Sequence, residues 1–174
     1  LRLNCLFDLN DTMLMIGAQR TPVMFMDKRT GLFTYWKGTG PISPHYAVDR
    51  PMDGTDWCHY ITDAGHGRLA IGFLLGHQQY LADRRDGRLL GQAFAMDLYA
   101  DQSITAAVRS GNRLYGVGWQ QRMHVRDLRT GAGLVWPLPD EGRAALADDS
   151  LHLLVGTAAS RFTVAPVPPA AHLR

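Results

Sequence analysis

The chain has 174 residues, of which 46% are hydrophobic and 20% charged, and its formal net charge is +2. This composition is typical of a folded globular domain and excludes a disordered tail. Acidic residues interrupt the basic ones, so we expect no concentrated positive surface for nucleic acid. No apolar run approaches the ~18–20 residues that a membrane-spanning helix requires. We therefore expect neither a nucleic acid nor a membrane as partner.

The chain contains two cysteines, Cys5 and Cys58, and both lie in apolar, strand-like surroundings. Two are too few for a disulfide framework, so we interpret them as buried free thiols and expect a reducing, cytoplasmic location. A disulfide between repeats is the alternative. The chain starts at Leu1 within a strand-like run, and we expect it to be a piece of a longer protein. Its alanine, arginine and glycine content is compatible with a bacterial source.

A short motif, Asp-x-Arg-Thr/Asp-Gly, occurs three times, at residues 27–31, 83–87 and 127–131. The spacings are 56 and 44 residues. A four-stranded β-propeller blade occupies about 40–50 residues, so the second spacing fits one blade and the first implies an insertion. In each copy the glycine can take the left-handed backbone conformation that a hairpin turn needs.

The flanks of the motif repeat as well. Apolar runs that carry glycine precede it, and a fourth such run has no motif after it; the runs are residues 13–17, 69–73, 114–118 and 151–156. A turn precedes each run, at Asn10-Asp11, Asp63 to Gly65, Ser110 to Asn112 and Asp148 to Ser150. Strand-length apolar runs between regular turns predict an all-β fold with almost no helix.

The repeats predict β-propeller blades, with three complete four-stranded units and a partial fourth. The expected units are residues 1–37, 56–97, 103–139 and 142–167, with an insertion at 37–56 and a C-terminal tail at 168–174. One such unit cannot bury both of its faces, and propellers contain four to eight blades around an axis. We expect these units to form part of a larger propeller; a closed ring of four blades is the alternative.

Residues 123–131 resemble the outer hairpin of a tryptophan–aspartate (WD) repeat. Trp36 and Trp136, each five residues after the motif glycine, resemble the pattern of quinoprotein-type propellers. The residue before the motif aspartate is Met26, Ala82 or Arg126, where WD repeats carry tryptophan. The resemblance implies a propeller fold, and it implies packing between blades for the recurring tryptophans.

The insertion at 37–56 is the main candidate for partner binding, because long loops on a rigid β scaffold often carry function. His45, Tyr46 and Arg50 are its candidate contact residues, and an inert insertion is the alternative. Trp119, beside a polar turn, is the candidate exposed aromatic anchor.

We assign no catalytic residue, cofactor or metal. The chain has no Gly-x-Ser-x-Gly motif and no glycine-rich phosphate loop. The cysteine and histidines at 58, 59, 66 and 77 lack the spacing of a metal site, and neighbouring strand residues point to opposite faces.

The sequence therefore favours a non-catalytic protein-interaction or sensor/regulatory module, a C-terminal or other portion of a larger protein. Its partner would be another protein or the remainder of the same polypeptide. The alternative is part of a propeller enzyme, a hydrolase, lyase or quinone-dependent dehydrogenase, with its site at the central channel. An interaction module should expose an apolar patch on a face or edge, whereas an enzyme should gather polar side chains in the channel. Pairing of open sheet edges between copies is a third possibility.

Overall fold

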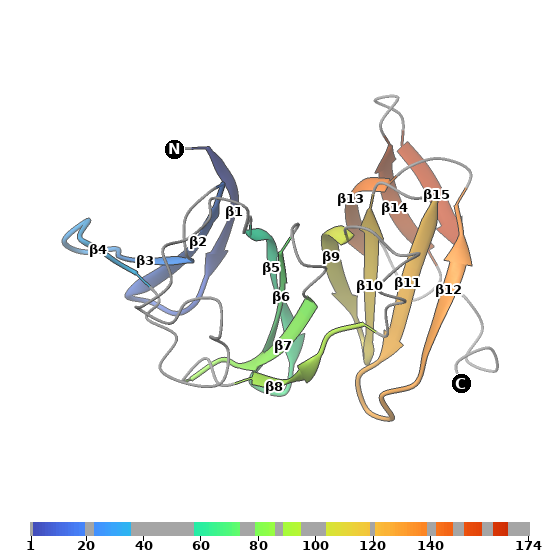
Figure 1. The fold of residues 1–174 in the computed structure, drawn as a ribbon, viewed down its shortest axis with the longest axis horizontal. Helices are drawn as coiled ribbons and strands as arrows, with labels where there is room; N and C mark the ends of the chain where they lie inside the picture. Colours follow the sequence, from blue (N-terminus) through green and yellow to red (C-terminus); the bar gives the residue numbers. More distant parts are fainter. Residues whose placement is uncertain are drawn as a thin grey trace.

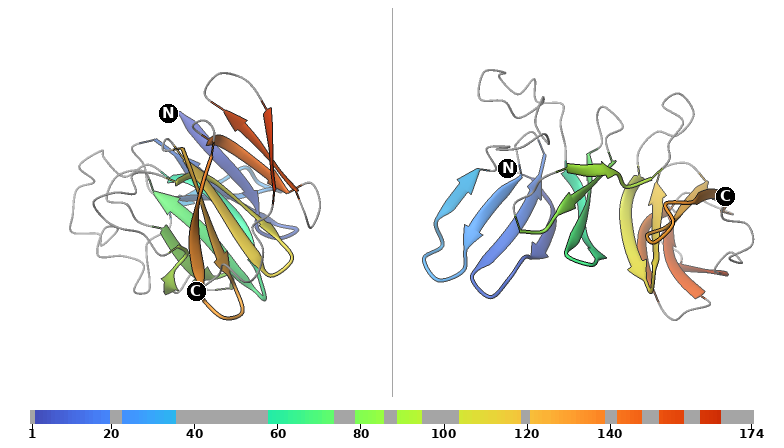
Figure 2. Two further views of the ribbon diagram at one scale, coloured as in Figure 1. Left: turned by 90° about the vertical axis from the view of Figure 1, so that its right-hand side faces the viewer. Right: turned by 90° about the horizontal axis from the view of Figure 1, so that it is seen from below.

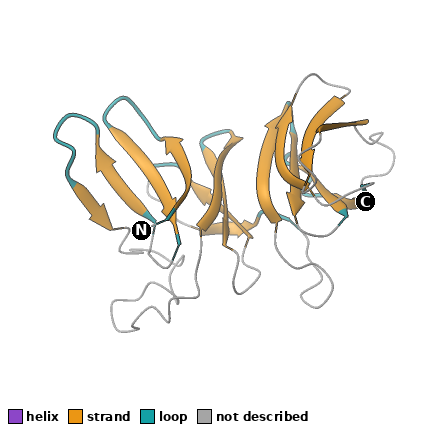
Figure 3. Ribbon diagram, turned by 90° about the horizontal axis from the view of Figure 1, so that it is seen from above, coloured by secondary structure: helices purple, strands orange, loops and turns teal. Residues whose placement is uncertain are grey.

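A computed structural model of the chain describes residues 2–19, 23–35, 58–73, 79–85, 89–94, 104–118, 121–138, 142–147, 152–157 and 162–166. The regular structure in these segments consists of fifteen strands, and none of these segments contains a helix (Figure 3). The expected all-β fold is confirmed.

The strands form four antiparallel sheets, each built from consecutive strands of the chain. The first sheet contains β1 (Leu3–Asp8), β2 (Met13–Ala18), β3 (Met24–Asp27) and β4 (Phe33–Tyr35). The second contains β5 (Cys58–Gly65), β6 (Arg68–Phe73), β7 (Gln79–Asp83) and β8 (Leu89–Gln92). The third contains β9 (Ile104–Ser110), β10 (Arg113–Gly118), β11 (Arg122–Asp127) and β12 (Gly133–Pro137). The fourth contains β13 (Gly142–Ala147), β14 (His152–Thr157) and β15 (Phe162–Pro166).

The four sheets follow one another across the molecule in chain order, with the first sheet at one end (Figures 1 and 2). The first strand of each sheet contacts the first strand of the next, so β1, β5, β9 and β13 lie next to one another in succession. The later strands of each sheet extend away from this inner row. Three four-stranded sheets and one three-stranded sheet are the units that the sequence predicts.

The repeated Asp-to-Gly motif forms the hairpin between the last two strands of the first and third sheets. The Asp127 carboxylate accepts hydrogen bonds from the backbone amides of Arg129 and Thr130, both at 2.8 Å. Gly131 then adopts a φ of 79°, which L-amino acids with a side chain rarely take. Asp27 accepts equivalent bonds in the first sheet. In both turns these amide donors lower the pKa of the aspartate below its usual range.

One expected turn lies slightly later in the chain. The sequence places the turn before β6 at residues 63–65, whereas β5 continues through Gly65 and the chain reverses at His66 and Gly67. His66 has a positive φ of 54°. Histidine adopts a positive φ more often than most residues with a side chain. Its turn propensity alone, however, does not predict that the chain reverses at His66.

The core lies between the sheets. One cluster joins the first and second sheets, and its buried members include Met15, Val23, Ile61, Leu69, Ile71 and Phe73. A second cluster joins the second and third sheets and includes Tyr60, Leu81, Phe94, Ile104 and Leu114. A third cluster covers the far face of the third sheet, toward β13. The second and third sheets therefore contribute apolar side chains from both of their faces.

A β-bulge recurs at the same place in all four inner strands. The pairing of each inner strand with the next strand skips one residue near its start: Asn4 in β1, His59 in β5, Thr105 in β9 and Arg143 in β13. A bulge changes which residues face which side of a sheet. Equivalent positions in the sheets can therefore be identified by counting from the bulge.

The turn aspartates predict an acid-sensitive contribution to stability. Because their folded-state pKa lies below the value near 3.9 of an unfolded aspartate, this stabilisation is complete above that value and is lost as the pH falls through the folded pKa. A variant with Asp27→Asn and Asp127→Asn should be less stable near neutral pH, since a neutral amide accepts weaker hydrogen bonds. Between about pH 5 and pH 2 it should lose less stability than the original chain.

Urea-unfolding midpoints measured across this pH range would test the prediction. The control is Asp11→Asn, at an exposed aspartate of the β1–β2 turn, and it should preserve the acid sensitivity. Equal acid sensitivity in the double variant and the original chain would contradict the prediction.

Candidate interaction surface

The contact residues predicted from the sequence, His45, Tyr46, Arg50 and Trp119, lie outside the described residues. Their roles stay predictions. Trp36 is also outside the described segments, whereas Trp136 is half-buried and packs against the apolar cluster on the third sheet. Trp136 thus packs within its own sheet, and the expected packing of the tryptophans between blades stays a prediction.

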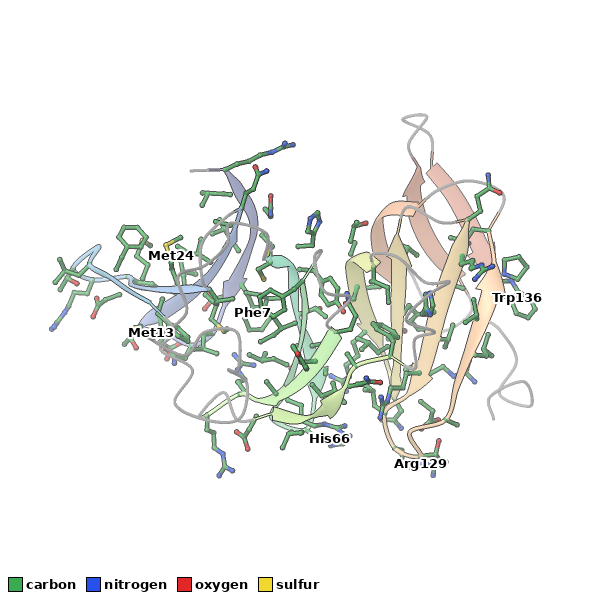
Figure 4. All side chains as sticks on the ribbon, in the orientation of Figure 1. Phe7, Met13, Met24, His66, Arg129 and Trp136 are labelled. Carbon is green, nitrogen blue, oxygen red and sulfur yellow. The ribbon has the colours of Figure 1, made fainter. Side chains whose placement is uncertain are left out.

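The outward face of the first sheet, on the side away from the second sheet, is apolar. Residues that pair across neighbouring strands point to the same side of a sheet. By this criterion the outward face comprises one charged residue, Asp8, which pairs with Leu14, and eight apolar residues: Leu3, Leu6, Leu14, Ile16, Ala18, Met24, Met26 and Phe33. Figure 4 shows Met24 on this side of the sheet, while Phe7 points toward the second sheet. We call this surface the outward face below.

Part of the outward face is open to solvent. Leu3, Leu6 and Phe33 are 53%, 60% and 56% exposed, whereas Ile16 and Met24 are buried. The other large exposed apolar residues of the described segments are Leu32 in the adjoining turn, Leu90 and Val135. Exposed apolar side chains are thus concentrated on the first sheet. Leu3 and Leu6 lie together on β1, and Leu32 and Phe33 lie together at the start of β4; apolar side chains gathered on one sheet mark an interaction site more often than scattered single residues do.

The positions equivalent to Leu3 and Leu6 are covered in the second sheet, and the position equivalent to Leu3 is covered in the third. Leu3, Cys58 and Ile104 each directly precede the bulge of their inner strand. They are 53%, 0% and 2% exposed, respectively. Two residues after the bulge, Leu6 is 60% exposed, whereas Ile61 is 7% exposed. Cys58 and Ile61 are buried against the first sheet, and Ile104 against the second. The outward face therefore consists of positions that the second and third sheets bury against the preceding sheet.

Arginine side chains join neighbouring sheets at the ends where the hairpin turns lie. Arg84, at the end of β7, donates from Nε to the Leu9 carbonyl of the β1–β2 turn at 3.0 Å. Its guanidinium carbon also lies 5.5 Å from the centre of the Phe7 ring, within cation–π range. Arg109 of β9 forms an ion pair with Asp63 of β5 at 3.1 Å. These contacts hold the first three sheets together from the turn side.

A further arginine connects the second and third sheets. Here the second sheet supplies the arginine, whereas Arg109 belongs to the third. Arg68 at the start of β6 donates to the carbonyl of Leu128, in the β11–β12 turn, at 3.2 Å. His66 and Arg129 lie at this same end of the molecule (Figure 4). The arginines of the turn end therefore bind backbone carbonyls and carboxylates of neighbouring sheets, which is a structural role.

The structure also locates some of the histidines and cysteines considered for metal binding. His59 is the bulge residue of β5, so the simple alternation of faces expected from the sequence is interrupted there. Burial, together with the charge of Arg2, lowers its pKa. Both cysteines are free thiols, with Cys58 buried and Cys5 half-buried. Within the described segments, no three histidine, cysteine or acidic side chains are grouped to hold a metal ion. The same segments contain no helix long and apolar enough to span a membrane.

No family model matches the chain, and no curated protein matches it. Solved structures do. The WD40 domain of Doa1 aligns with a TM-score of 0.69 at 8% identity, over 97% of this chain and 52% of that one. The WD40 domain of Pan2 from Neurospora crassa aligns with a TM-score of 0.62 at 17% identity, over 97% of this chain and 47% of that one. The computationally designed protein Ika4 aligns with a TM-score of 0.61 at 17% identity, over 95% of this chain and 91% of that one.

These alignments agree with the sheet order and with the row of inner strands. The chain has the β-propeller fold. Its four sheets are blades, and the chain spans about half the length of the two natural WD40 domains. The suspected resemblance to WD-type propellers is confirmed at the level of fold.

Sequence reasoning did not identify the outward face. Its residues belong to apolar strands that look the same as those of the covered blades. The bulge at Asn4 determines on which side Leu3 and Leu6 lie, and because the same bulge recurs in the second and third sheets, the faces differ only in what covers them. A bulge of this kind has no sequence marker as clear as the Asp-to-Gly turn.

Arg84 tests the contacts between the first two blades. Arg84→Met keeps an apolar stem but removes the bonds to the Leu9 carbonyl, and we expect it to lower the free energy of unfolding by about 1–2 kcal/mol. The neighbouring Arg85 is a matched control, because its side chain is 85% exposed and pairs with Asp83 in its own blade. Arg85→Met should change stability by less than about 0.5 kcal/mol. Urea unfolding of both variants measures the difference, and equal effects would show that Arg84 does not join the blades.

Proposed function

We propose that this chain is a non-catalytic protein-interaction module that forms part of a larger propeller. In this proposal another blade of that propeller docks on the outward face of β1–β4. The completed ring would serve as a rigid scaffold for a protein partner, in a sensor or regulatory role within a larger protein. The observation that carries the proposal is the exposure of Leu3 and Leu6 at positions that are buried in the next blade.

The physical basis is the lost burial of apolar side chains. Full burial of a leucine or phenylalanine side chain stabilises a protein by about 1.5–3 kcal/mol, so covering the half-exposed Leu3, Leu6 and Phe33 would contribute about 1 kcal/mol each. The docking blade should present an apolar face like the one that the first blade presents to the second, which includes Cys5, Phe7, Met15 and Phe25. A neighbouring blade provides a surface of this shape and chemistry.

The extent of the similarity supports the same proposal. The chain covers 43–52% of the natural WD40 structures with which it aligns. A ring of that size needs further blades on both sides of this set. The fourth blade supplies three strands, and in propellers a strand from elsewhere in the chain often completes a blade.

For the partner of the completed ring, the prediction from the sequence is retained. The insertion at 37–56, with His45, Tyr46 and Arg50, and the aromatic Trp119 are the proposed contacts. Long connections and exposed aromatic side chains on a rigid β scaffold are common binding elements.

The mass of the isolated chain in solution tests the docking proposal. We expect the chain alone to self-associate in light scattering, because the outward face lacks its neighbour and can pair with another copy. Leu6→Glu should reduce this association strongly, since it places a charge beside Leu3 among the exposed apolar side chains of the face. Because Leu6 is 60% exposed, the variant should remain folded.

Val135→Glu is the matched control. Val135 is 45% exposed and lies on β12, the outer strand of the third blade, away from the outward face. This variant should associate as the original chain does. A monodisperse monomer for the original chain, with no effect of Leu6→Glu, would show that the outward face is an ordinary surface and would overturn the proposal.

A further inference from the structure

The two cysteines meet across the interface between the first and second blades. Cys5 of β1 faces the second blade, Cys58 of β5 faces the first, and their sulfur atoms are 3.9 Å apart. The residues are 53 positions apart in the sequence, so this contact is a product of the fold. Cys58 is buried, whereas Cys5 is half-buried at the edge of the interface.

Gly17 provides the space for the two sulfur atoms. It pairs with Cys5 in the β1–β2 ladder. A Cβ atom at this position would collide with the Cys5 sulfur and would lie 2.7 Å from the Cys58 sulfur. Glycine is therefore needed here for close approach, and its absent side chain leaves both thiols in one shared space.

The backbone around the thiols is also held in place. Cys5 directly follows the bulge residue Asn4, and Cys58 directly precedes the bulge residue of its own strand. The Asn4 side chain donates from Nδ2 to the Cys58 carbonyl at 3.0 Å. This bond ties the two strands together beside the sulfur atoms, so little backbone movement is needed to bring the thiols into bonding distance.

We propose that Cys5 and Cys58 form a redox-active dithiol that a peroxide converts to a disulfide joining the first and second blades. The inference is independent of the proposed function, because it concerns only these two blades of this chain. Disulfides in natural proteins link cysteines whose Cβ atoms already lie close together and point toward each other. The sulfur atoms of Cys5 and Cys58 already lie 3.9 Å apart across one interface, so they must approach by about 2 Å to bond.

The reaction proceeds in two balanced steps. The Cys5 thiolate attacks one oxygen of hydrogen peroxide, the O–O bond breaks, and the products are a sulfenic acid on Cys5 and hydroxide, which takes up a proton to form water. The Cys58 sulfur then attacks the Cys5 sulfur, the S–O bond breaks, and the hydroxyl group leaves with the Cys58 proton as a second water. The two thiols lose two electrons in total, and the peroxide is reduced to two waters.

The electrostatics give the two cysteines different roles. The hydrogen bond from the Cys58 thiol, together with backbone amides of Gly17 and Ile61, lowers the pKa of Cys5. The same thiol contact and burial raise the pKa of Cys58. Cys5 is thus the thiolate that reacts first, and it is also the more accessible of the two. Cys58 is the resolving thiol.

The disulfide would close a loop that runs from residue 5 to residue 58. That loop contains the second, third and fourth strands of the first blade and the 37–56 insertion. A cross-link across so long a loop restricts the unfolded chain, so the oxidised protein should unfold at a temperature roughly 5–10 °C higher than the reduced protein.

The test uses the full chain, reduced and then treated with hydrogen peroxide under native conditions. Remaining thiols are blocked with N-ethylmaleimide, and intact mass and unreduced peptide maps are recorded. We expect both thiols to be lost together in a product without covalent cross-links between chains, with Cys5 and Cys58 in one cross-linked peptide and with a raised unfolding temperature that dithiothreitol reverses. Separate oxidation of the two thiols, or cross-links between chains only, would overturn the proposal.

Two glycine variants sharpen the result. Gly17→Ala forces the sulfur atoms apart and should slow or abolish disulfide formation. Gly72→Ala, at the equivalent position of the second blade, meets the Tyr60 ring in place of a thiol and is the control for crowding alone. Disulfide formation at the same rate in Gly17→Ala and Gly72→Ala would contradict the assigned role of Gly17. The peptide map of the original chain remains decisive if either variant fails to fold.

Discussion

The burial of apolar sheet faces against neighbouring sheets is the interaction on which the structure depends. In β6, Leu69 and Ile71 face the first blade, while Ala70 faces the third. A single blade with two apolar faces cannot remove both from water, and stacking in a row leaves one uncovered face at each end. The row of inner strands, the arginine contacts at the turn end and the exposure of the outward face all follow from this requirement.

The inner strands connect the packing of the blades with the chemistry of the two thiols. β5 and β9 each contact an inner strand on both sides, β1 and β13 each contact one, and all four carry a bulge near their start. The bulges position Leu3 toward solvent and Cys5 toward Cys58, although the two residues are only two apart in the sequence. A substitution in β1 therefore affects both the outward face and the interface between the first and second blades.

The sequence was sufficient to predict the repeated elements, because their signals are local. The Asp-to-Gly turns need an acceptor for two amides and a residue with positive φ, and Asp127 and Gly131 provide these within five residues. The outward face and the thiol pair could not be predicted in this way. They depend on the bulge at Asn4 and on contacts between strands more than fifty residues apart. The proposed contacts at residues 45, 46, 50 and 119 lie outside the described segments.

Repeats within one chain provide an internal reference for function that distant structural similarity does not. At 8–17% identity the aligned propellers show the fold alone, since propellers support many unrelated activities. The inner strands of the blades carry their bulge at the same place, however, so equivalent residues can be compared. A difference in exposure between two such residues has a local physical cause. Leu3 is 53% exposed where Cys58 is buried completely, and the difference lies in what covers each residue. In the proposed function, Leu3 and Leu6 belong to the surface on which a neighbouring blade docks, because the equivalent positions of the second blade are buried.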